Sequence, residues 1–163
     1  MVKGVDCPMC ADAHLPTNAH SDLVVESEVA FTRLHHNQSH AGYSVVVLKR
    51  HAAELHDLDD WEYDAFWRDV RRASRAIAQL FRPVKLDTLV MGHLCPHVHC
   101  HIYPQYQGDD PHALVNIQDG AVRLSDEQRA ASVADLRSLM GPSDGRARSQ
   151  PRLRARRFGP VSP

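Results

Sequence analysis

The sequence lacks any apolar run near the roughly 20 residues that a membrane-spanning helix needs, so we expect a soluble protein without a membrane partner. Its N-terminus also lacks the apolar stretch of a secretory signal peptide, which makes the cytoplasm the expected location. Cysteine is scarce, with four among 163 residues, and we expect reduced thiols or metal ligands rather than a disulfide framework. The formal net charge is only −1, so a nucleic-acid partner is not expected.

The composition that remains is that of a globular protein, with 43% hydrophobic and 24% charged residues. The length is enough for one domain with a substantial core. From Gly141 on, six arginines stand against one aspartate, and no apolar periodicity is present. We therefore expect residues 1–140 to form one domain and residues 141–163 to be a basic, disordered tail.

Short apolar runs bounded by turn residues predict β-strands. The run 43–48 is almost continuously apolar, which is typical of a strand covered on both faces. The predicted strands span 23–25, 29–34, 43–48, 84–91 and 97–103, and Asp119-Gly120 indicates a hairpin between 113–117 and 121–124.

A long amphipathic helix is predicted after the third strand. Asp59 can accept hydrogen bonds at its N-terminus, and Glu62 stands where a capping box would be completed. Apolar residues then recur every three or four positions, with Asp69 expected on the solvent side, until Pro83 ends the helix. A second helix with its own capping box is expected over 125–139.

Three histidines alternate with apolar residues in the run 97–102. In an extended strand His97, His99 and His101 would line one face, because alternate side chains point to the same side. A helix would spread the same rings over about 200°. Pro96 and Pro104 bracket the run, and we expect them to end the strand. A merely solvated histidine run is the alternative, although exposed strand faces rarely carry three histidines.

Cys7-Pro8-Met9-Cys10 forms a C-x-x-C motif near the N-terminus. Two thiolates at this spacing supply half of a tetrahedral zinc site. A redox-active pair would be expected between a strand and a helix, and no strand is predicted before it. Two inert thiols in a frayed terminus are the alternative.

This order of parts resembles the histidine triad family, whose signature H-φ-H-φ-H-φ-φ (φ apolar) matches residues 97–103 if Cys100 counts as apolar. Gly42-Tyr43 leading a valine-rich strand into Lys49-Arg50-His51 agrees, and the resemblance covers about residues 5–112. It implies an α+β fold, in which one long helix packs on an antiparallel sheet, followed here by a second C-terminal helix. It also implies nucleotidyl transfer or hydrolysis at a nucleoside α-phosphate, and often a homodimer.

The resemblance also implies roles for individual residues. His99 would be the nucleophile that forms a covalent nucleotidyl intermediate, and His101 would hydrogen-bond the phosphate or the leaving group. In zinc-bearing branches the first triad histidine is a metal ligand, together with a C-x-x-C pair and a histidine after the preceding strand. The corresponding residues here are Cys7, Cys10, His51 and His97, a set typical of a closed structural zinc site.

Substrate contacts follow less directly from the resemblance. Asn37 lies in the loop where relatives contact the ribose, and Asp87 and His93 stand where many relatives have asparagine. Gln105 replaces an arginine that follows the triad in many hydrolases, whereas Asp110-Pro111 matches their later dipeptide. Dinucleoside polyphosphates or nucleoside phosphoramidates are therefore the expected substrates.

Two other classes of function match parts of the sequence. A metalloenzyme using a His-x-His pair is disfavoured, because a cupin needs a glutamate where Tyr103-Pro104 stands and an amidohydrolase barrel needs about 250 residues. A non-catalytic nucleotide-binding or interaction module with a structural zinc site remains the alternative.

Overall fold

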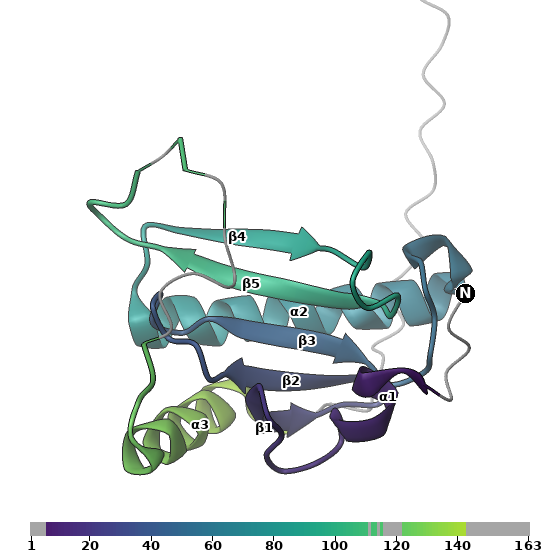
Figure 1. Ribbon diagram of the computed structural model, residues 1–163, viewed down its shortest axis with the longest axis horizontal. Helices are drawn as coiled ribbons and strands as arrows, with labels where there is room; N and C mark the ends of the chain where they lie inside the picture. Colours follow the sequence, from purple (N-terminus) through teal and green to yellow (C-terminus); the bar gives the residue numbers. More distant parts are fainter. Residues whose placement is uncertain (1–5, 111, 114, 116–121, 143–163) are drawn as a thin grey trace, which may run out of the picture.

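The computed structural model of the chain describes residues 6–110, 112, 113, 115 and 122–142 (Figure 1). The hairpin expected around Asp119-Gly120, Pro111 and most of the basic tail lie outside these residues. Within the described part, no helix has both the length and the apolar character to cross a membrane.

The fold is α+β, as expected, and is built on a five-stranded antiparallel sheet with strand order β1-β2-β3-β5-β4 (Figure 1). The long helix α2 lies across one face, and α3 packs beside β1 at one edge. The strands are β1 Ser21–Glu26, β2 Ala30–His35, β3 Ser44–Leu48, β4 Lys85–Val90 and β5 His99–Gln105. The helices are α1 Pro8–Asp12, the 3-10 turn η2 Leu55–Asp57, α2 Asp60–Phe81 and α3 Asp126–Met140.

The two faces of the central strands have different chemistry. Val98, Cys100 and Ile102 are at most 1% exposed and belong to the main core, with residues of α2 such as Phe66 and Ile77. The predicted apolar side of the histidine run is therefore the helix-covered side. On the opposite face, α1 packs against Val45 and Val47 of β3 through Met9 and Ala13, forming a smaller core.

Both long helices begin close to where the sequence predicts, but one cap differs. The Asp59 carboxylate accepts from the Glu62 amide at 2.8 Å. The Glu62 carboxylate does not complete the capping box. It accepts a hydrogen bond from Arg50 Nε at 3.0 Å instead, because Arg50, two residues after the end of β3, lies beside the helix. At α3, Ser125 and Gln128 form the expected reciprocal box.

Asp69 does not face water, and this prediction was wrong. It is 8% exposed and accepts a hydrogen bond from the Ser27 hydroxyl in the β1–β2 turn. Burial raises the pKa of the Asp69 carboxyl. Helical periodicity places a residue on a helix face, but it does not reveal that a neighbouring turn covers that face.

The prolines bracket β5 differently from the prediction. Regular pairing starts at His99 and continues through Pro104 to Gln105. Pro104 is tolerated because β3 pairs with β5 only as far as Ile102. The Pro104 carbonyl points to the side of β5 where β3 no longer pairs, and it accepts a hydrogen bond from His40 Nδ1 at 2.7 Å. The N–H that proline lacks would point to the same side, so its absence removes no hydrogen bond between strands.

Candidate functional site

The triad histidines are brought together at the start of β5, and all three are buried. His97, His99 and His101 are 1%, 4% and 7% exposed. The His99 and His101 rings are neighbours, with centroids 4.8 Å apart and planes at 75°. His97 lies two residues before His99, outside the regular strand, and its ring meets the N-terminal segment instead.

His99 is held in one tautomer by its own backbone neighbour. Its Nδ1 lies 2.6 Å from the His97 carbonyl oxygen. A carbonyl only accepts, so Nδ1 carries the proton and Nε2 keeps a free lone pair while the ring is neutral. Burial lowers the pKa of His99, which keeps the ring neutral at physiological pH. This arrangement suits a nucleophile, which must present an unprotonated nitrogen.

His101 is held by a residue that the sequence analysis missed. The Tyr43 hydroxyl lies 2.8 Å from His101 Nδ1. Burial, followed by the neighbouring His99 and His35, lowers the pKa of His101 to about 3. Strand alternation could have indicated Tyr43: Val45 pairs with His101, so Tyr43, two residues before Val45, is on the same face of the sheet as His101. Using that signal requires the register between β3 and β5.

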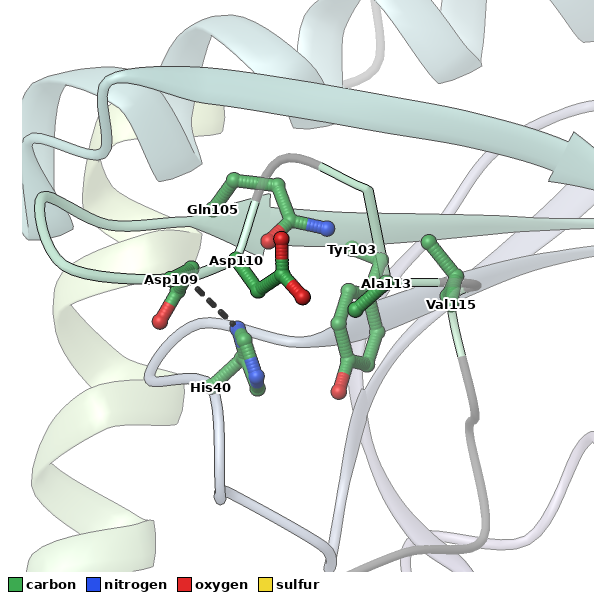
Figure 2. A pocket seen from close by; sticks show the side chains of 7 residues that line it. All are labelled: His40, Tyr103, Gln105, Asp109, Asp110, Ala113 and Val115. Atoms are coloured by element: carbon green, nitrogen blue, oxygen red, sulfur yellow. Dashed lines mark ion pairs between the residues drawn. The ribbon is translucent and has the colours of Figure 1, made fainter.

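A cavity of about 150 Å³ opens beyond His101 at the far end of β5. Figure 2 shows Tyr103 and Gln105 entering it from β5 and His40 from the β2–β3 loop. The Asp109 carboxylate lies 3.5 Å from His40 Nδ1. His40 also packs on Tyr103, with ring centroids 4.4 Å apart. His99 and His101 are not among the residues that line this cavity, which are His40, Tyr103, Gln105, Asp109, Asp110, Ala113 and Val115.

The predicted substrate contacts are only partly gathered. Gln105 Nε2 donates to the Asp87 carboxylate at 2.8 Å, because the β4–β5 register puts both on the triad face. Asn37 is 7% exposed, and its Oδ1 accepts from the Ser39 amide within the β2–β3 loop. His93 is exposed in the segment between β4 and β5. The structure therefore places only Gln105 on the cavity.

A second cluster could hold a metal ion. One side-chain ligand atom each from Cys7, Cys10, His51 and His97 lie within 4.8 Å of one another. His97 Nδ1 is 3.4 Å from both Cys7 and Cys10 Sγ, and His51 Nδ1 is 3.4 Å from Cys10 Sγ. These separations are close to the edges of about 3.5–3.8 Å that a tetrahedral zinc site gives its ligands.

The tautomer of His97 fits metal binding. Its Nε2 is 2.7 Å from the Leu48 carbonyl and must donate to it, which leaves the Nδ1 lone pair facing the thiols. Burial and the adjacent Cys7 raise the pKa of Cys10 to about 11, so two thiols packed here favour a cation that would hold them as thiolates. Cys95, which the sequence analysis did not assign, lies beside the cluster with its Sγ 4.0 Å from that of Cys7.

Comparisons with known proteins agree with this architecture. A family model for the HIT domain matches residues 16–108. An uncharacterized HIT-like protein of Methanocaldococcus jannaschii is 30% identical over 91 residues, which are 53% of this chain and 70% of that protein. An AP-4-A phosphorylase of Mycobacterium tuberculosis is 29% identical over 93 residues, 53% of this chain but only 48% of the phosphorylase, so the chain spans about half of its length.

Solved structures share the fold. A histidine triad protein from Bradyrhizobium japonicum superposes with a TM-score of 0.66 at 20% identity, covering 75% of this chain and 92% of that one. A zinc-bound histidine triad family protein from Mycobacterium smegmatis gives 0.61 at 20% identity, covering 85% and 95%.

Proposed function

The chain belongs to the HIT domain family, and from this premise we propose that it is a nucleotide hydrolase or nucleotidyl transferase acting at a nucleoside α-phosphate. Its substrates are dinucleoside polyphosphates or nucleoside phosphoramidates. The relative named AP-4-A phosphorylase supports the first of these classes. Asp87, beside Gln105 on the triad face, favours a leaving group with fewer negative charges.

The observation that carries this proposal is the hydrogen bond from His99 Nδ1 to the His97 carbonyl. It aims an unprotonated Nε2 away from the backbone. In the first step this lone pair forms a bond to the α-phosphorus while the bond from phosphorus to the leaving group breaks. The leaving group then takes up a proton from solvent. In the second step water attacks phosphorus and loses a proton to solvent, the electron pair of the N–P bond returns to His99 Nε2, and a nucleoside monophosphate is released.

The remaining predicted residues would assist in distinct ways. His101, next to His99, would donate a hydrogen bond to the phosphate oxygens or to the leaving group. Gln105, on the cavity, would contact the leaving group, and Asn37 the ribose. His93 would reach substrate only by moving in from its exposed position.

Zinc is the metal that the cluster of Cys7, Cys10, His51 and His97 fits, and the zinc-bound relative from Mycobacterium smegmatis supports this choice. Bound there, zinc would supply a cross-link rather than reaction chemistry, since four protein ligands leave no open position. Cys7 and Cys10 would anchor the N-terminal segment, and His97 would orient the strand that carries His99.

A homodimer is the proposed assembly, formed through the free edge of β4. This strand ends the sheet, and among described residues no strand pairs with its outer side. Val84, Val90 and Leu94, at or near its ends, are 68%, 40% and 79% exposed. Apolar side chains along an unpaired edge are typical of a strand that pairs with another chain.

The test is incubation with a panel of dinucleoside polyphosphates and nucleoside phosphoramidates, followed by acid quenching and mass spectrometry. We expect turnover and a nucleotidylated peptide containing His99. His99→Asn should lower turnover by at least roughly 10³-fold and abolish the adduct. His56→Asn, which changes an exposed histidine of η2, should leave both unchanged. Turnover that persists in the His99 variant would contradict the proposal.

A non-catalytic nucleotide-binding module is the second candidate, and one observation favours it. His99 is 4% exposed and lies outside the lining of the cavity. A binding module would bind nucleotides in the same panel with neither turnover nor adduct. Calorimetry beside the turnover assay separates the two functions.

A further inference from the structure

Tyr43 is placed with little freedom beside the triad. It is 0% exposed. Its ring stacks on that of His35 with the centroids 4.5 Å apart and lies edge-on to that of Tyr103 with the centroids 5.2 Å apart. The turn before it is tight: Gly42 has φ +89°, and a Cβ there would lie 2.6 Å from the Phe81 ring. The phenol ring is therefore held in one position, in which its hydroxyl oxygen lies 2.8 Å from His101 Nδ1.

The direction of this hydrogen bond follows from which groups have partners. Among the described residues, His101 Nδ1 is the hydrogen-bond partner of the Tyr43 hydroxyl. If Nδ1 carried the proton and donated it, the phenolic proton would be buried without an acceptor, which is costly. The hydroxyl therefore donates, and Nδ1 accepts. A neutral His101 must then carry its proton on Nε2.

His99 has the opposite arrangement, because its Nδ1 donates to the His97 carbonyl at 2.6 Å. We propose that Tyr43 is a positioning residue that holds the His101 proton on Nε2, so that two neighbouring imidazoles present opposite groups, a lone pair on His99 and an N–H on His101. The inference rests on the proposed function, because it says how one ring of the triad attacks while the next one donates.

The chemistry needs this division. The rings are 4.8 Å apart, and two identical tautomers would offer either two nucleophiles or two donors. With opposite tautomers, the His99 lone pair attacks phosphorus while the His101 N–H donates a hydrogen bond to an oxygen of the phosphate or of the leaving group and keeps its proton. Burial lowers the pKa of His101 to about 3, so the N–H is that of a neutral ring at physiological pH.

The first test reads the tautomer directly. Nitrogen–proton correlation NMR of protein labelled with ¹⁵N-histidine distinguishes Nδ1–H from Nε2–H rings. We expect His99 to be Nδ1–H and His101 to be Nε2–H in the wild type, and Tyr43→Phe to convert His101 to a mixture of both. Tyr106→Phe removes a hydroxyl that donates to the Ala41 carbonyl at 2.6 Å, and it should leave both rings unchanged. An Nδ1–H ring at His101 in the wild type, or no change in Tyr43→Phe, would overturn the inference.

The second test is kinetic. Tyr43→Phe should lower kcat by roughly tenfold or more with KM little changed, since the hydroxyl acts on a proton donor rather than on substrate binding. A merely structural role would instead lower the amount of folded protein and would not separate the effect on kcat from that on KM. A wild type that turns over no substrate would contradict the proposed function, while the NMR measurement would still decide the role of Tyr43.

Discussion

At the residue scale, burial lowers the pKa of several histidines of this chain, among them His35, His99 and His101. His35 is one example. Its Nδ1 accepts from the Asn37 amide at 3.0 Å, so a second proton on the ring would break that hydrogen bond. Burial, the largest cause, lowers the pKa of His35 to about 4.

A pH dependence of stability follows from His35. The unfolded ring binds a proton near its ordinary pKa of about 6.5, whereas the folded ring does so near 4. The free energy of unfolding should therefore fall as pH drops from about 6.5 to 4, with roughly 1–3 kcal/mol due to His35. His35→Asn, whose side-chain oxygen can accept from the same amide, should flatten this slope in urea titrations at pH 7 and 4.5.

The two proteins differ in slope only through His35, because the other titrating groups are the same in both. His56→Asn changes a histidine that is exposed and should keep the wild-type slope. Equal slopes for the His35 variant and the wild type would show that His35 does not carry the effect.

At the element scale, α1 has five residues, too few to be stable alone. It is held by the packing of Met9 and Ala13 on β3 and by the cluster of Cys7 and Cys10 with the histidines. The N-terminal segment therefore depends on contacts with residues far along the chain. A bound metal would join them most strongly.

The zinc proposal predicts different results for two neighbouring cysteines. Cys7→Ser should lower the zinc content from about one per chain to near zero and raise hydrogen exchange in α1, because a thiolate ligand is lost. Cys95→Ser removes a thiol whose sulfur is only 4.0 Å from Cys7 Sγ but which is outside the proposed ligand set. This variant should retain zinc. Elemental analysis of both proteins is the measurement, and a metal-free wild type purified without chelator would refute the assignment.

At the scale of the whole molecule, the two edges of the sheet differ. β1 is partly covered by α3, whose Arg137 donates to the Val24 carbonyl at 2.8 Å. The outer side of β4 has no strand partner among the described residues and carries exposed apolar side chains, including Val90. Association through β4 would bury them, whereas association through β1 would have to displace α3.

Val90→Arg should therefore convert a dimer to a monomer, because a charge would be placed in the strand-to-strand contact. Sedimentation velocity at several protein concentrations measures the change. Leu139→Arg makes the same substitution at a 38% exposed position of α3, near the other edge, and should remain dimeric. A wild type that sediments as a monomer at micromolar concentration would exclude the dimer.

The predicted domain boundary at residue 140 leads to a further prediction. Met140 is 6% exposed, and the Gly141 amide donates to the Arg137 carbonyl at the end of α3. A chain ending after Pro142 keeps these contacts. Its free energy of unfolding should therefore differ from that of the full chain by less than about 0.5 kcal/mol, measured by urea titration. A loss above about 2 kcal/mol would mean that the basic tail is part of the fold.

Much of the fold could be predicted from the sequence, because it is encoded locally. Alternation in the run 97–102 predicts a strand with an apolar side, and a 3.6-residue period predicts α2. The C-x-x-C spacing of Cys7-Pro8-Met9-Cys10 likewise predicts two ligands of a metal site. Each pattern depends only on the geometry of a few consecutive residues.

What the sequence by itself determined is therefore which side chains share a strand or helix face, including His99 and His101 on one strand. Only the tertiary structure decided which residues meet them from elsewhere: Tyr43 at His101, Ser27 at Asp69 and His40 at the Pro104 carbonyl. The physical reason is that strand register and loop placement join residues many positions apart. Those contacts are set by the packing of the whole chain, and no local period records them.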